Sequence, residues 1–318
     1  MQVKAKPACQ SEIRALIQSH SLNKTAHPRL VKLTRALTVN MSRALSVGGQ
    51  GSVPRVDDVV AVACNDVVVT LDSSNLNRIK KESPAPKAFV REEPGETVVT
   101  GDADRLANNV SRAGIYCALI RLVYGSSTCR PVVLQALEGF LREGGGDVSL
   151  PKARGDTDAL AAIPGALAGH STAVSLSDDA VSNAVPGGQA PGYSKVERLQ
   201  LLSGSPITCG ALAIATVQLR SALHANSVSL AMSCEALKAS TAMFADSKLP
   251  NISASKYVAD VSRDIVALLD GSSFVNAKPK DGGIGSTQPV VKVQLLRLSE
   301  LALFPHCLHG PVAVHVLV

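Results

Sequence analysis

The spacing of apolar residues predicts that most of this chain is helical. Apolar side chains recur every three or four residues over 105–124, and helical spacing returns in later segments. Those segments are 56–63, 131–142, 158–168, 206–245 and 257–269. In 105–124 we expect one buried helix face, made of Leu106, Val110, Ala113, Cys117, Ile120 and Val123. The pattern therefore predicts a mainly α fold.

A short strand signal interrupts this pattern near the start of the chain. Residues 67–71 form a β-branched run, and the Asp-Ser-Ser-Asn that follows offers an N-cap for a helix. That helix would carry Arg78, Lys80 and Lys81. We therefore expect a small α+β part ahead of the long helices.

Breaks in the pattern predict the organisation of the chain. Glycine and proline mark a linker at 44–54, an irregular stretch at 83–105, and loops at 169–193 and 270–289. The expected parts are a basic N-terminal extension over 1–50, a small α+β part over 51–105 and a helical bundle over 106–318.

Composition narrows the kind of core that these helices can build. Hydrophobic residues make up 46% of the chain, but aromatic residues only 3%, and tryptophan is absent. Ala, Val and Leu must therefore form the core, and their small side chains let helices approach closely. Charged residues interrupt each apolar run, so we expect no membrane span.

The positive charge of the chain lies at its beginning. Residues 1–50 hold eight basic residues and one acid, Glu12, whereas the remaining 268 residues hold 24 basic and 25 acidic ones. An arm that binds nucleic acid would use such charge, but no aromatic side chain is present there to stack on bases. A mitochondrial targeting segment has the same composition and is the interpretation we favour, with a cytoplasmic location as the alternative. A solvated basic helix remains a third possibility.

Cysteine and histidine give little indication of a metal site. The seven cysteines are dispersed and form no Cys-x-x-Cys pair, which is typical of a reducing compartment. His306 and His309, with Cys307 between them, have the spacing of half a metal site. Without a second pair of ligands nearby we favour a loop or core role for them and expect no metal.

Six segments between residues 55 and 312 carry a recognisable pattern when they are taken in order. They are RVDDVVAVACNDVVVTLDSSNLNRIKKE, ALIRLVYGSSTCRPVVLQALEGFL, VSLPKARGDTDALAAIPGALAGH, ERLQLLSGSPITCGALAIATVQ, SLAMSCEALKASTAMFADSKL and FPHCLHGPV. Together they resemble the histidine and phenylalanine ammonia-lyase family, and more closely its histidine branch. The resemblance implies an ammonia-lyase-like bundle of long antiparallel helices. It also implies an active site around a prosthetic group that the chain makes from its own backbone.

That group, called MIO, forms in the family from an Ala-Ser-Gly triplet. The glycine nitrogen attacks the alanine carbonyl, two waters are lost, and the serine side chain becomes an exocyclic methylene. The matching triplet here is Ala153-Arg154-Gly155, followed by Asp156. Arginine has no leaving group on Cβ, so we expect the MIO group to be absent and no other cofactor to replace it.

Other positions depart from the family in the same direction. Glu96 stands where the resemblance implies a catalytic tyrosine, Ser203 where it implies an asparagine that contacts the prosthetic group, and His306 where glutamine is usual. A carboxylate cannot act as the phenolic base without a new environment. The family's chains also continue beyond this one, and the resemblance implies that their further part supplies a catalytic glutamate and much of the tetramer contact. We therefore expect a truncated, degenerate site at Glu96, Ala153, Arg154, Gly155, Asp156 and Ser203.

Three functions are compatible with these features. The favoured one is a non-catalytic structural or regulatory subunit, a pseudoenzyme that forms a homo-oligomer or binds protein partners. The alternatives are a working lyase that converts histidine to urocanate, or another aromatic amino acid to an acrylate, and a ribonucleoprotein subunit that uses residues 1–50. A decayed gene product without a stable fold is a fourth possibility.

Overall fold

The computed structural model describes ten segments of the chain: 44–49, 53–64, 67–82, 105–125, 128–141, 148–152, 155–167, 175–176, 193–244 and 256–275. They fall into two compact units, and the division lies within one long helix, between Asn226 and Ser227. The unit described first holds the segments up to Asn226. The basic extension lies outside the described residues up to residue 43, as do Glu96, Ala153, Arg154 and the segment with His306, Cys307 and His309.

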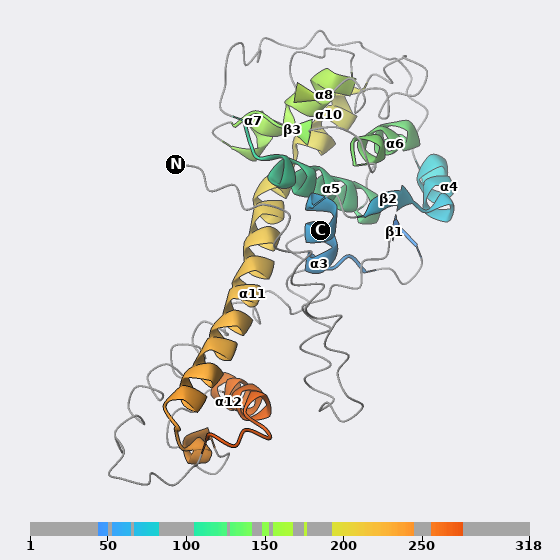
Figure 1. The fold of residues 1–318 in the computed structure, drawn as a ribbon. Coiled ribbons are helices and arrows are strands. Elements are labelled where there is room, and N and C mark those ends of the chain that lie inside the picture. Colours follow the sequence, from blue (N-terminus) through green and yellow to red (C-terminus); the bar gives the residue numbers. More distant parts are fainter. Residues whose placement is uncertain are drawn as a thin grey trace. The chain divides into compact units, whose positions relative to one another are not determined.

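The first unit begins with a strand, a helix and a second strand (Figure 1). Strand β1 (Ala44–Val47) pairs in parallel with β2 (Val68–Leu71), and α3 (Val56–Ala63) makes the crossover. The predicted strand and helix are confirmed. The linker predicted over 44–54 is wrong at its start: Ala44–Val47 is a strand, and the buried Val47 belongs to the core. The glycines directly after this short apolar run indicated a linker, so the run itself was not recognised as a strand.

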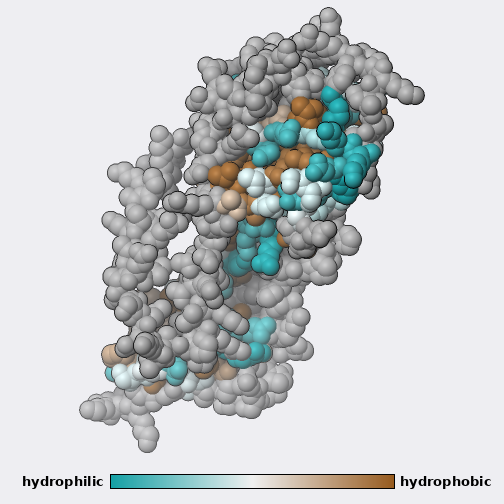
Figure 2. All heavy atoms as spheres, turned by 90° about the vertical axis from the view of Figure 1, so that its right-hand side faces the viewer, coloured by the Kyte–Doolittle hydropathy of each residue, from teal (hydrophilic) through white to brown (hydrophobic). Residues whose placement is uncertain are grey.

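Helix α4 (Ser73–Glu82) follows the second strand, as the Asp-Ser-Ser-Asn signal predicted. It exposes Arg78, Lys80 and Lys81 and buries Ile79. Figure 2 shows the molecule from the side on which α4 lies in Figure 1, with hydrophilic and hydrophobic patches next to each other. Gly48, with a φ of +92°, ends β1, and its carbonyl accepts a hydrogen bond from Asn75 Nδ2 of α4 at 2.7 Å. This hydrogen bond connects α4 to the end of β1 within the small α+β part.

The core of this unit is built around α5 (Asn108–Tyr124). Helix α5 packs against α3, against α6 (Pro131–Phe140) and against the short strand β3 (Val148–Ser149). The prediction that α5 buries a single face is wrong. Twelve of its residues, from every side of the helix, are buried, because neighbours surround it.

A buried arginine holds two helix ends within this core. Arg112 is 1% exposed, and its guanidinium donates to three backbone carbonyls. Nε reaches Val62 O at 3.1 Å near the end of α3, Nη2 reaches Leu141 O at 2.9 Å just after α6, and Nη1 reaches Phe140 O at 3.4 Å. Burial lowers the pKa of Arg112. The partial negative charge of helix C-termini stabilises a cation at this place without a carboxylate.

The predicted helix at 158–168 is two short ones. Helix α7 (Asp156–Leu160) ends at Ala161, and α8 (Ala162–Leu167) begins directly after it. Strand β4 (Ser175–Leu176), inside the predicted loop 169–193, pairs antiparallel with β3. The sequence reading also missed α10 (Lys195–Leu202), which contacts α7 and α5.

Helix α11 (Pro206–Ala236) is the longest in the described part of the chain, with 31 residues. Two glycines bring its beginning close to α5. A Cβ on Gly210 would lie 2.8 Å from the Ala113 carbonyl carbon, and one on Gly114 would lie 2.9 Å from Ile207 Cγ1. The helices therefore approach at a distance that only glycine permits at these two positions.

The second unit holds the last turns of α11, the 3₁₀ helix η1 (Thr241–Phe244) and α12 (Lys256–Leu268). Its buried apolar residues are Leu230, Ala231, Cys234, Ala239, Phe244, Val258, Ile265, Leu269 and Val275. The predicted helix at 257–269 is confirmed. The helix predicted to run from 206 to 245 ends at Ala236 instead, and Lys238, with a φ of +49°, marks the turn after it.

Among the described residues, the segment Lys195–Ala236 is long and apolar enough to cross a membrane by length and composition alone. One such segment is weak evidence for a span, since a core helix of a water-soluble protein meets the same criterion. The expectation of no span stays a prediction.

Candidate functional site

Asp156 caps the N-terminus of α11. Its Oδ2 accepts from the backbone N–H of Thr208 and its Oδ1 accepts from Thr208 Oγ1, each at 2.8 Å. Thr208 lies in the first turn of α11, where backbone N–H groups lack partners within the helix and attract negative charge. Both carboxylate oxygens are thus engaged, and Asp156 serves to join α7 to α11.

Ser203 directly follows α10 and is its C-cap residue. Its Oγ donates to Gln200 O at 2.9 Å and accepts a hydrogen bond from Arg121 Nη1 of α5. Arg121 Nη2 also donates to Gln200 O, so the guanidinium provides hydrogen-bond donors to the C-terminal end of α10. Burial lowers the pKa of Arg121. No described base contacts Ser203 Oγ in a way that would make it a nucleophile.

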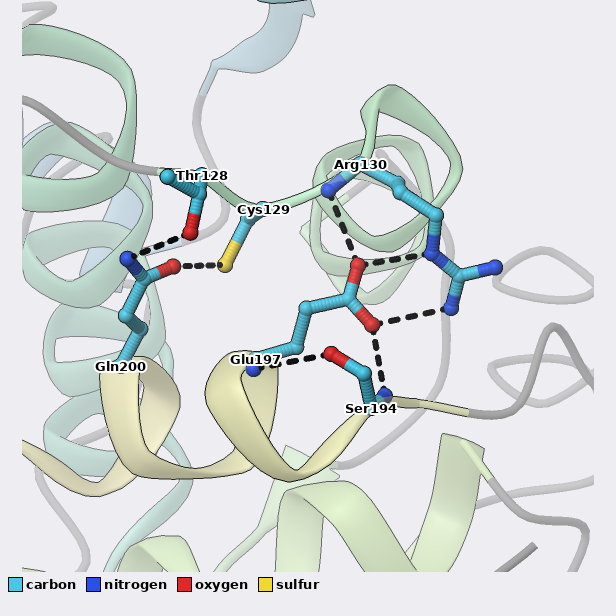
Figure 3. Close-up of polar contacts among 6 residues, drawn as sticks. All are labelled: Thr128, Cys129, Arg130, Ser194, Glu197 and Gln200. Carbon is cyan, nitrogen blue, oxygen red and sulfur yellow. Dashed lines mark hydrogen bonds and ion pairs between the residues drawn. The ribbon is translucent and has the colours of Figure 1, made fainter. Parts of the chain in front are cut away.

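Arg130 and Glu197 form the best-connected ion pair of this region (Figure 3). Glu197 Oε1 accepts from Arg130 Nε at 2.7 Å and from Arg130 N at 3.0 Å, and Oε2 accepts from Nη2 at 2.9 Å. Oε2 also accepts from Ser194 N at 2.7 Å, while Ser194 Oγ accepts from Glu197 N at 3.2 Å. This is a capping box joined to a bidentate arginine pair.

The charge of Glu197 is stabilised although its side chain is buried. Burial acts to raise the pKa of Glu197, but hydrogen bonds from Arg130 and Ser194 outweigh it, and the pKa lies below its ordinary value. Glu197 is therefore a carboxylate at neutral pH. With its oxygens occupied by four donors, it orders the loop before α6 and does not act as a proton acceptor.

Figure 3 also shows a thiol and an amide that continue this network. Cys129 Sγ donates to Gln200 Oε1 at 3.0 Å, and Gln200 Nε2 donates to Thr128 Oγ1 at 3.0 Å. Near Asp156, burial and the Asp156 charge raise the pKa of Cys209. A protonated thiol is a poor nucleophile. Within the described segments, no three His, Cys, Asp or Glu residues gather as a metal site.

The structure thus places three of the six expected site residues. Gly155 and Asp156 lie at the start of α7, and Ser203 lies at the end of α10, which α7 contacts. Ala153, Arg154 and Glu96 lie outside the described residues. The sequence reading missed Arg130 and Glu197. Ser-x-x-Glu at 194–197 was the available signal, since that spacing is typical of a capping box.

The triplet at 153–155 differs from the one that forms the MIO group in the family that the six segments resemble. Gly155 has extended backbone, with φ −158° and ψ 169°, and a Cβ there would meet nothing within 4 Å. Its neighbour Arg154 has no hydroxyl to lose.

Comparison with known proteins identifies the family. The profile of the aromatic amino acid lyases matches residues 96–289, which is more than half of the chain. The chain belongs to the aromatic amino acid lyase family. The ammonia-lyase resemblance seen in the six segments is thereby confirmed.

Solved structures of the family share the fold. The match to phenylalanine ammonia-lyase of a Rhodosporidium yeast has 18% identity and a TM-score of 0.61, and covers 85% of this chain and 47% of that one. For tyrosine aminomutase of Streptomyces globisporus the identity is 17% and the TM-score is 0.66, and the match covers 84% of this chain and 60% of that one. For histidine ammonia-lyase of Trypanosoma cruzi the identity is 17% and the TM-score is 0.55, and the match covers 70% of this chain and 49% of that one. These matches confirm the expected fold class, mainly α and ammonia-lyase-like.

This chain spans about half the length of the structures that it matches. A search of curated proteins found no match. The family comprises carbon–nitrogen lyases and aminomutases, and this lyase-family chain shares their fold.

Proposed function

We propose that this chain is a non-catalytic member of the lyase family that serves as a structural or regulatory subunit. The observation that carries the proposal is the triplet Ala153-Arg154-Gly155, which lacks the hydroxyl needed to build the family's electrophile. Elimination of ammonia from an aromatic amino acid needs an electron sink, and the side chains of this triplet do not supply one.

The polar contacts of the described part support the same conclusion. Asp156 is committed to the first turn of α11, Ser203 to the end of α10, and Glu197 to Arg130. Each of these groups fixes one helix end to another element. A carboxylate or hydroxyl whose partners are helix termini contributes to folding, and it would have to release them to act as an acid or base.

A turnover assay tests the proposal. The full chain is incubated with histidine, phenylalanine and tyrosine, and released ammonia and the conjugated acrylate product are measured, with an intact lyase as positive control. We expect no turnover. Product formation by the natural chain would refute the proposal and favour the alternative, a working lyase, which family membership supports.

The variant Arg154→Ser sharpens this test, because it restores the Ala-Ser-Gly triplet. We expect it to remain inactive, since Glu96 still stands at the tyrosine position and Ser203 at the asparagine position. The absorbance of the prosthetic group, measured beside turnover, reports whether the triplet cyclises. Activity in this single variant would show that only the electrophile had been missing.

We also propose, from the charge of residues 1–50, that the protein is targeted to mitochondria. A fluorescent fusion with and without these residues tests this location. Loss of an RNA-bound fraction on their removal, with steep salt dependence, would instead favour the ribonucleoprotein alternative.

A further inference from the structure

The surroundings of α11 change along its length. Ala213 and Thr216 are buried in the first unit, and Leu230 and Cys234 are buried in the second. From Val217 to Ser229 no side chain is buried. Packing therefore holds the helix on both sides of this stretch. The stretch itself depends mainly on its own backbone hydrogen bonds, which give a helix only marginal stability in water.

The last residues of this uncovered stretch are poor helix formers. Asn226, Ser227, Val228 and Ser229 follow one another directly, and we call them the weak turn. Asparagine and serine side chains compete with the helix for backbone hydrogen bonds, and valine loses rotamer freedom in a helix. The earlier residues 218–223 are strong helix formers except for one serine. Low helix propensity and lack of cover therefore coincide at the weak turn.

The beginning of α11 holds residues that form helices equally poorly. Ile207, Thr208, Cys209 and Gly210 rank with or below the residues of the weak turn. There, however, Ile207 is 6% exposed, and Gly210 is buried against Ala113 of α5. Burial in the core compensates for low helix propensity at this end, whereas the weak turn has no buried side chain with the same effect.

Side-chain hydroxyls compete for helix carbonyls on both sides of the uncovered stretch. Thr216 Oγ1 donates to Leu212 O at 2.7 Å, and Ser233 Oγ donates to Ser229 O at 2.8 Å. Such hydrogen bonds to the carbonyl four residues earlier destabilise a helix slightly and often bend it. The second of them uses a carbonyl of the weak turn itself. It therefore lowers the free energy that is needed to open the helix at this place.

We propose that α11 opens locally at the weak turn, which acts as a hinge in the connection between the two compact units. The division between the units, at Asn226 and Ser227, falls inside this turn. Opening breaks the backbone hydrogen bonds of about one helical turn, while the side chains buried in either unit keep their packing. The hinge is independent of the proposed role as a subunit, because it involves neither the triplet at 153–155 nor a partner.

Hydrogen–deuterium exchange of the full chain, followed by mass spectrometry of peptides from α11, tests the hinge. The measured rate of each amide is divided by its intrinsic rate. Exchange at the weak turn should then be at least about tenfold faster than at 211–216 and 231–234, because those amides open only when buried side chains leave a core. Equal protection along the whole of α11, as in a helix that is covered throughout, would overturn the inference.

A pair of proline variants sharpens this test, since proline inside an intact helix removes a hydrogen bond and clashes with the preceding turn. Asn226→Pro should leave the exchange of the slowest α5 amides unchanged within about twofold. The matched control Ala215→Pro, at an exposed position in the packed part of α11, should accelerate it about a hundredfold. Equal effects of the two variants, or an unfolded Asn226→Pro chain, would contradict the hinge.

A variant that strengthens the weak turn has the opposite expected effect. Combining Asn226→Ala, Ser227→Ala and Ser229→Ala raises helix propensity without adding a contact and should slow exchange at this turn about tenfold. An unchanged rate there would mean that helix propensity does not control the opening, and the hinge would be disproved. None of these measurements depends on turnover, so this proposal and the proposed function fail separately.

Discussion

Helices α5 and α11 have similar apolar character but different surroundings. In α5, twelve of 17 residues are buried, including Arg112 and Ser111. In α11, the 13 residues from Val217 to Ser229 include none that is buried. Helix α5 is enclosed by elements of its own unit, whereas no side chain of that stretch of α11 is fully covered. The difference teaches that burial follows from what surrounds a helix and not from composition alone.

A matched pair of leucine truncations measures this difference most directly. Leu119 in α5 is 0% exposed and Leu212 in α11 is 39% exposed. We expect Leu119→Ala to lower the free energy of unfolding by about 3–4 kcal/mol, because it leaves a cavity, and Leu212→Ala by less than about 1 kcal/mol. Urea unfolding at low protein concentration measures both. Equal losses would mean that α11 is enclosed in solution as α5 is.

A smaller effect is expected where a polar contact, and not packing, joins the elements. Glu197→Gln keeps the shape of the side chain but leaves Arg130 without its counter-charge. We expect a loss of about 2–3 kcal/mol at pH 7.

The pH dependence of this loss follows from the sign of the pKa shift. The pKa of Glu197 is lower in the folded protein than its ordinary value near 4.5. Its contribution to stability is therefore fully present above about pH 4.5 and disappears as the pH falls through the lower folded-state pKa. Urea unfolding of both proteins from pH 7 to pH 3 measures it. A gap between natural chain and variant that does not shrink on acidification would contradict this assignment.

The smallest loss of stability is expected where α5 and α11 approach each other at Gly210. Gly210→Ala gains up to about 1 kcal/mol of helix propensity, but its Cβ would meet the backbone of Ala113 at 2.8 Å. We expect the clash to prevail and the net loss to be about 1–2 kcal/mol in thermal or urea unfolding. Ser221→Ala, at an exposed position of the same helix, should change stability by no more than about 0.5 kcal/mol. If Gly210→Ala stabilised the protein instead, the close approach of α5 and α11 would be disproved.

Periodicity predicted the helices that have one apolar face, and it misled where a helix is enclosed. The bounds of α3 agree with those expected because Asp57 and Asp58 mark its first turn, and the buried Val59 and Val62 follow at helical spacing. Arg112 and Tyr116 lie outside the expected face of α5, yet both are buried, and the Arg112 guanidinium has backbone carbonyls as partners there. The short helix α10 offered too few turns for its pattern to stand out.

The candidate site was predictable only in part, for a different reason. The triplet at 153–155 and its lost hydroxyl can be read from the residues themselves. The use of Asp156 as a cap cannot, because its partner Thr208 lies 52 residues further along the chain. The pair of Arg130 and Glu197 spans 67 residues. Such contacts depend on which helix ends the fold brings together.

Arg112 has a consequence for how the first unit comes apart. One guanidinium serves the last turn of α3 and the end of α6, which lie 50 and 28–29 residues from it in sequence. If the end of α3 or of α6 frays, Arg112 moves, and its contact with the end of the other helix is disturbed. The buried guanidinium is then left with fewer hydrogen-bond acceptors. The two helices are thereby coupled through α5. We expect their backbone amides to exchange with solvent as one cooperative group rather than from each helix end independently.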